Sequence, residues 1–217
     1  MTLTNRTTFP SLLTYARRGL LAAGLLVGSA AQAAPLNLLL EPSPDIFSSG
    51  INVDYTASSG ELTATGTAST FEDDGSGPPL TIDNGSFDLT ANIDNSGVLS
   101  AGTLDIGGTI NSIGANSNIL LTGTLTDLGF PTSGSGDPLE FLFNVTGGDL
   151  ASDYGTSGGI ILTQSGFSDG FTLDFNNGPF AGVADIGVVV PVPAALWLFG
   201  SGLLGLTGIA ARRRSAG

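Results

Sequence analysis

Carboxylates are the only charged side chains between residues 34 and 188 of this chain. All 19 Asp and Glu residues fall between Glu41 and Asp185, and the six Arg residues lie outside that stretch. His, Cys and Lys are absent throughout. This composition excludes Ser–His–Asp and Cys–His catalysis, Schiff-base lysines, histidine zinc sites and arginine clamps on phosphate. The stretch can offer only acid chemistry and oxygen ligands.

Oxygen ligands suit hard cations, of which calcium is the natural candidate. The densest acidic cluster is Glu72, Asp73 and Asp74. It lacks the alternating spacing of a calcium loop and a distant bidentate glutamate, so a solvated acidic loop is the competing interpretation. We therefore expect no obligatory cofactor and keep calcium as the one candidate ligand.

A pair of carboxylates can also serve as the acid and base of a glycosidase. With 19 carboxylates some close pairs are unavoidable, and the single Trp of the chain, Trp197, lies near the C-terminus. Sugar-binding sites commonly stack sugars on aromatic rings, so we expect the protein not to be an enzyme. The concentrated negative charge also predicts repulsion from nucleic acid.

The acidic stretch alternates apolar and polar residues at the period of a half-buried β-strand. The clearest example is Ser86–Asp94, in which Phe87, Leu89, Ala91 and Ile93 share one face. The same period recurs at Ile51, Val53, Tyr55 and Ala57, at Leu139, Phe141, Phe143 and Val145, and along the threonine-rich segment 119–128; Gly182–Val190 is expected to be the last strand.

Turn signals separate these strands at Asp83–Gly85, Asp94–Gly97, Gly107–Gly108 and Gly147–Gly148. Short strands without helical periodicity predict an all-β domain, an antiparallel β-sandwich or a barrel-like structure. A β-solenoid is the alternative, although no fixed repeat period is present.

The first 33 residues have the pattern of a secretory signal peptide. Arg17 and Arg18 precede an apolar stretch from Gly19 to Gly28, which is too short to span a bilayer. The small residues Ala31 and Ala33 then fit a signal peptidase site, so that Ala34 becomes the new N-terminus. General secretion is favoured over a twin-arginine route, because the residues after Arg18 fit that route weakly.

The last 29 residues, 189–217, have the pattern of a membrane-spanning tail. Residues 194–211 carry no charge and would span about 27 Å as a helix, close to the thickness of a bilayer. The cluster Arg212, Arg213 and Arg214 follows, and such clusters stay cytoplasmic. The acidic domain, residues 34–188, is therefore expected outside the inner membrane.

The run VPVPAALWLFGSGLLGLTGIAARRR closely resembles the PEP-CTERM sorting signal of Gram-negative bacteria. That signal has a short proline motif, a transmembrane helix with Trp and Gly, and a terminal arginine cluster. The matching residues are Val190, Pro191, Val192, Pro193, Trp197, Gly200 and Gly202. Val192 stands where the family motif has glutamate, which leaves the exosortase subtype open.

The resemblance implies that an exosortase, a membrane cysteine transpeptidase, removes the tail in a host that makes exopolysaccharide. The expected partners are signal peptidase, the exosortase, the inner membrane before processing, and exopolysaccharide. Segments such as LLTGTLTDLGF and LEFLFNVTGGDLASDYG also resemble a group of uncharacterised ectodomains that carry this signal, which adds no activity. We expect a non-catalytic surface or matrix protein; a calcium-dependent adhesion or carbohydrate-binding module, and a carboxylate glycosidase, are the alternatives.

Overall fold

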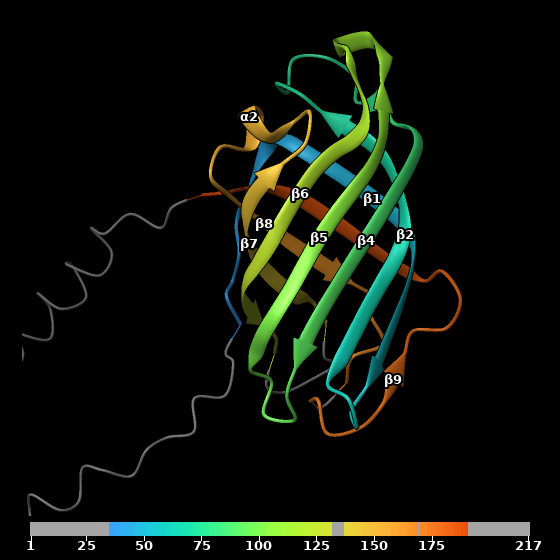
Figure 1. Cartoon of the computed structure of the whole chain (residues 1–217), viewed down its shortest axis with the longest axis vertical. Helices are drawn as coiled ribbons and strands as arrows, with labels where there is room; N and C mark the ends of the chain where they lie inside the picture. The colour runs from blue at the N-terminus through green and yellow to red at the C-terminus, as the bar shows by residue number, and fades with distance from the viewer. Residues whose placement is uncertain (1–34, 132–136, 169, 191–217) are drawn as a thin grey trace, which may run out of the picture. The chain divides into compact units, whose positions relative to one another are not determined.

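The computed structural model describes residues 35–131, 137–168 and 170–190, which form an all-β structure with almost no helix (Figure 1). The strands are β1 (Leu40–Thr56), β2 (Glu61–Glu72), β3 (Leu80–Thr81), β4 (Asp83–Ile93), β5 (Leu99–Ile110), β6 (Ala115–Gly129), β7 (Leu139–Gly147), β8 (Ser157–Thr163), β9 (Phe175–Asn176) and β10 (Gly182–Val189). The helical pieces are a 3-10 turn, η1 (Asn111–Ile113), and one turn of α-helix, α2 (Ala151–Tyr154).

Eight of these strands close into an antiparallel barrel, because β1 pairs with β2 along one edge and with β10 along the other. The ring runs β1, β2, β4, β5, β6, β7, β8, β10, while β3 and β9 are two-residue additions to β2 and β1. The expectation of an antiparallel β-domain is confirmed in its barrel form. Closure leaves no long sheet edge for a second sheet or for solenoid coils.

The strand alternation predicted from the sequence corresponds to the inside and outside of this barrel. In β4 the side chains of Phe87, Leu89, Ala91 and Ile93 are at most 2% exposed, whereas the residues between them face solvent. The inward residues of β1 and β7 are likewise buried: Ile51, Val53, Tyr55, Leu139, Phe141 and Phe143. Ala57 lies beyond the end of β1, and Val145 is half-buried.

Two of the predicted turns are wrong, because their residues lie inside strands. Asp83–Gly85 begins β4, beside a shift of register between β4 and β5. Gly107–Gly108 lies within β5, beside shifts of register between β5 and β6. A Cβ on Gly85 would stand 1.9 Å from the carbonyl oxygen of Ala68, so this glycine permits a close approach of backbones. Such bulges bend a sheet towards closure. The turn at Asp94–Gly97 is confirmed by a hydrogen bond from Gly97 N to Asp94 O of 2.8 Å.

The two ends of the barrel are closed by different means. At one end α2 brings in the buried Tyr154, whose hydroxyl donates to the carbonyl of Ile186 at 2.7 Å. At the other end Tyr55 donates to the carbonyls of Ile93 and Phe171 at 3.0 and 3.1 Å. Rings pack around it with centroids 4.9–6.0 Å apart; we call this set the aromatic plug: Tyr55, Phe130, Phe167, Phe171 and Phe175.

Residues 35–40, here called the strap, lie against the outside of the barrel and reach its last strand (Figure 1). Leu40 is opposite Val189, and the amide of Val190 donates to the carbonyl of Leu39 at 2.8 Å. The predicted last strand is thus confirmed as β10, Gly182–Val189. The segments on which the signal peptide and the transmembrane tail are predicted lie outside the described residues.

Candidate functional site

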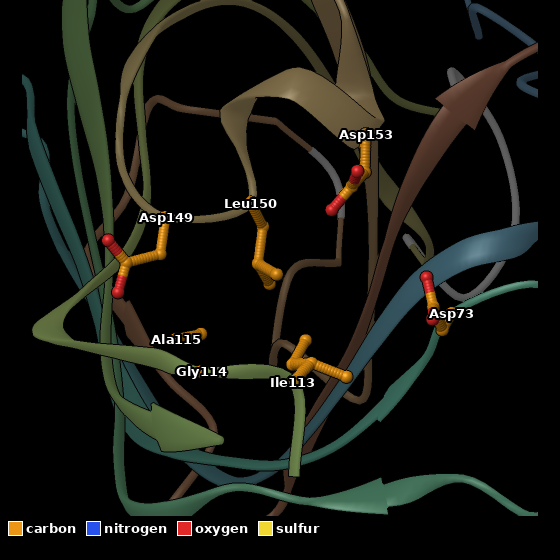
Figure 2. Close-up of a pocket in the computed structure, with 7 residues that line it drawn as sticks. All are labelled: Asp73, Ile113, Gly114, Ala115, Asp149, Leu150 and Asp153. Atoms are coloured by element: carbon orange, nitrogen blue, oxygen red, sulfur yellow. The ribbon is translucent and has the colours of Figure 1, made fainter. Parts of the chain in front are cut away.

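An acidic pocket opens at the α2 end of the barrel (Figure 2). Its volume is about 340 Å³. The lining consists of three aspartates and four small or apolar residues: Asp73, Asp149, Asp153, Ile113, Gly114, Ala115 and Leu150. We call this the acidic pocket.

Three separate connections bring these residues together. Asp73 follows β2 directly, and Ile113 and Gly114 form the turn between β5 and β6. Asp149 precedes α2 and Asp153 lies within it, in the connection between β7 and β8. Figure 2 shows the three carboxylates on different sides of the opening, with Leu150 and Ile113 between them.

Asp149 is held by the neighbouring hairpin rather than free to move. Its Oδ2 accepts the amide of Ser117 at 2.8 Å. That bond, with further bonds from the Ser117 side chain and the Asn116 backbone, keeps the pKa of Asp149 below its ordinary value. The side chain of Asp149 therefore stays ionised, which is compatible both with binding a cation and with being a solvated surface charge.

The predicted cluster Glu72, Asp73 and Asp74 stays together in the fold and lines a second pocket of about 320 Å³. Asp74 turns to its own loop, where Oδ1 accepts the amide and the hydroxyl of Ser76 at 2.9 and 2.6 Å, and these bonds lower its pKa. Glu72 ends β2 opposite Asp45. Of the three, only Asp73 joins the other aspartates of the acidic pocket. Among the residues described here, no group of three acidic side chains is placed to hold one metal ion.

Asp45 is a carboxylate that its surroundings perturb strongly. Burial, the charge of Asp185 on β10 and the charge of Glu72 on β2 together raise its pKa to about 6. Burial also raises the pKa of Asp185. These three carboxylates come from adjacent strands, β10, β1 and β2, and no Lys, Arg or His exists in this stretch to neutralise them.

Tyr154 lies between this group and the acidic pocket. Burial, followed by the charges of Asp45 and Asp153, raises the pKa of its phenol well above the ordinary value. The hydroxyl therefore remains protonated and is occupied by its bond to Ile186. Its role here is to fasten α2 to the barrel wall.

The three aspartates of the acidic pocket give it a negative potential that attracts cations. No aromatic side chain is among the described residues that line the acidic pocket, so a sugar ring has no stacking platform there. Sequence reasoning found Asp73 but missed Asp45, Asp149, Asp153 and Asp185. The four-residue spacing of Asp149 and Asp153 is a weak signal of a shared helical face. Asp45 and Asp185 carry no such signal, because only strand pairing brings them to Glu72.

The predicted processing residues fall almost wholly outside the described part of the chain. This applies to Ala31, Ala33 and Ala34, to Pro191 through Gly202 in the sorting motif, and to Arg212, Arg213 and Arg214. Val190 alone is described, and it is hydrogen-bonded to the strap. In residues 35–131, 137–168 and 170–190, no helix is long and apolar enough to cross a membrane.

Comparison with family models, curated proteins and solved structures finds no match to this chain.

Proposed function

We propose that this chain is an exported, non-catalytic surface or matrix protein, whose barrel is carried out of the cell and released from its tail by an exosortase. The barrel then resides in the envelope or the exopolysaccharide outside it. Its acidic surface keeps it soluble and keeps it from nucleic acid.

The observation that carries this proposal is the ordered C-terminal signature. A proline motif from Val190 to Pro193, an uncharged run of membrane length and the cluster Arg212–Arg214 follow one another without a gap. Each feature alone is common, but their order matches the sorting signal. The signal-like segment 1–33 supports the same direction of export independently.

The barrel supports the proposal as a suitable passenger. It closes on itself without disulfides, and its buried side chains form one continuous core. The residues described at the two ends of the domain are adjacent, since Leu39 and Val190 share a hydrogen bond. A domain whose chain enters and leaves at one place can be anchored through either end without unfolding.

A reporter fusion tests the sorting proposal. Residues 190–217 attached to a neutral secreted reporter are expected to send it to the envelope of an exosortase-bearing host and to be removed there. The matched control is the same fusion with Pro191 and Pro193 replaced by Ala, which should stay in the inner membrane. A reporter left intact in the membrane with the native sequence would contradict the proposal.

A calcium-dependent binding module is the second candidate, favoured by the negative potential that Asp73, Asp149 and Asp153 create around one pocket, where they are not grouped as ligands of a single ion. Calcium titration by calorimetry should then give a saturable signal that Asp73→Asn and Asp153→Asn each weaken. The matched control is Glu61→Gln, an exposed carboxylate on β2 that does not line this pocket. No heat above the dilution blank would remove this candidate.

A further inference from the structure

Two paired glycines lie in the outer wall of the barrel beneath the strap. Gly159 of β8 and Gly187 of β10 are direct partners in the sheet, and neither has a side chain to fill the wall. A Cβ on Gly159 would lie 3.0 Å from the methyl groups of Leu38 and Leu40, and one on Gly187 would lie 3.2 Å from Cβ of Leu40. The paired glycines thus form a groove that seats the leucines of the strap.

A buried carboxylate stands beside this groove. Glu140 of β7 points outward between the inward Leu139 and Phe141, yet it is only 6% exposed. Its two oxygens accept the amides of Asn37 and Leu38 at 2.9 and 3.0 Å. Because an uncompensated buried carboxylate is costly, the groove requires a chain that presents two successive amides at this point.

The strap is separable from the barrel that it covers. Leu40 pairs with Val189 and Asp45 pairs with Gly187. Between these two pairs β1 advances by five residues while β10 advances by only two, so β1 bulges away from β10 here. The slack is taken up by residues 41–44, which include two prolines and have no ladder partner. The ring itself closes through Asp45 and the residues after it. Lifting the strap therefore leaves the eight-stranded ring intact.

We propose that the strap of one copy of this chain binds the outer groove of a second copy, so that barrels associate by exchanging their N-terminal straps. The partner is a second copy because the groove is complementary to this strap in its leucine seats and in its carboxylate. An exchanged strap makes the same contacts as a resident one. This inference does not depend on the sorting of the C-terminal tail.

Concentration and salt should control the exchange. A short tether gives the resident strap an effective concentration on the order of 1 mM, so exchange is expected as the protein approaches that concentration. Residues 35–40 carry no charge, but each barrel carries 19 carboxylates in its sequence, and two barrels repel one another. Added salt should screen this repulsion and increase the exchanged fraction.

Disulfide trapping tests the exchange, because the chain has no cysteine of its own. Leu40 and Val189 are direct antiparallel partners, a geometry that a disulfide can bridge. Full-length chains carrying Leu40→Cys and full-length chains carrying Val189→Cys are mixed, unfolded, refolded together and oxidised, with detergent in large excess. The readout is the fraction of covalent dimer linked between positions 40 and 189, identified by peptide mass spectrometry.

The linked fraction is expected to rise at least tenfold between roughly 10 µM and 1 mM protein, and to rise further with salt. Adding Leu38→Asp to the Leu40→Cys chain should abolish it, because a charge cannot enter the glycine groove. The double variant Leu40→Cys/Val189→Cys must close an internal disulfide at low concentration. Failure of that closure would overturn the strap geometry. The background level is the amount of dimer formed when Ile119→Cys replaces Val189→Cys in the mixture. Normal internal closure of the double variant, together with no more 40–189 dimer at 1 mM than this background, would overturn the exchange.

Discussion

At the scale of single residues, two outward-facing carboxylates of this barrel meet opposite circumstances. Glu140 is buried but satisfied, since two backbone amides of the strap bind its oxygens. Asp45 is half-buried beside Asp185 and Glu72, and the charges of both oppose its ionisation. The first carboxylate should stabilise the fold through these hydrogen bonds, and the second should weaken it at neutral pH.

Replacing Asp45 by Asn should stabilise the protein at neutral pH and change little at pH 4. The folded-state pKa is raised from 3.8 to about 6, so the folded chain holds this proton more tightly. The free energy of unfolding due to Asp45 is therefore highest below 3.8 and falls as the pH rises to about 6. Allowing for solvent screening of a partly exposed group, the gain at pH 7.5 should be about 1–2 kcal/mol.

Urea unfolding of the native chain and of Asp45→Asn at pH 4 and pH 7.5 measures this difference. The exposed Glu61→Gln serves as the control for removing one charge anywhere on the surface. An equal gain from Glu61→Gln would assign the effect to net charge rather than to the surroundings of Asp45.

Replacing Glu140 by Gln should loosen the strap without opening the barrel. The amide group of Gln presents N–H groups where the strap also presents them, so at least one buried amide loses its acceptor, at a cost of about 1–3 kcal/mol. Hydrogen exchange should then show faster exchange at Asn37 and Leu38, with β4 and β5 unchanged. Unaltered protection of these two amides would mean that the strap is held by its leucines alone.

At the scale of elements, the aromatic plug covers the core at the end of the barrel opposite α2. Phe171 is 1% exposed and contacts three other rings of the plug and Tyr55. Phe171→Ala should therefore lower the free energy of unfolding by about 3–5 kcal/mol. Leu173→Ala, two residues away at a side chain that is 75% exposed, should change it by less than about 0.5 kcal/mol. Similar losses in the two variants would show that the plug is not a cooperative part of the core.

The elements also show how far local pattern could predict this structure. The alternation in β4 is a property of nine consecutive residues, and its inward face was predictable from them. The choice between sandwich and barrel depends on β1 pairing with β10, more than a hundred residues away, which no local period encodes. Gly85 and Gly108 suggested turns because glycine permits both turns and close strand contacts, and only the register of the neighbouring strands distinguishes the two.

The same reasoning applies to the acidic pocket. Asp73 was noticed because three acids are consecutive in the sequence, whereas Asp149 and Asp153 became its neighbours only through the closure of the barrel. Glu140 faces outward, as the alternation of Leu139, Phe141 and Phe143 implies. Its burial follows from the strap, a segment with no strand-like alternation of polar residues to reveal it.

At the scale of the whole molecule, the charge pattern should make stability depend on salt. Like charges even face one another across strands, as Asp88 on β4 is the direct partner of Asp105 on β5. Sodium chloride should raise the melting temperature by screening these repulsions over about 8–10 Å at physiological ionic strength. A melting temperature that does not change with salt would show that the carboxylates are too widely spaced for their repulsion to lower stability.

Calcium should separate a bound ion from plain screening. If the acidic pocket binds the ion, calcium should raise the melting temperature well above sodium at equal ionic strength, because binding free energy adds to that of the folded state. Identical melting curves in the two salts would leave the barrel without a calcium site and would leave the surface-protein account as it stands.

The central claim, that this chain is exported and then freed from its tail, is tested most directly by the intact mass of the mature protein. The full chain should be produced in a Gram-negative host with its exosortase and in the same host without it. With the enzyme, the account predicts a product that begins at Ala34 and has lost Arg212, Arg213 and Arg214 with the membrane-spanning tail. Without the enzyme, the account predicts a membrane-bound product that begins at Ala34 and retains Arg212, Arg213 and Arg214. The same mass in both hosts, or a product that still contains residues 1–33, would contradict it.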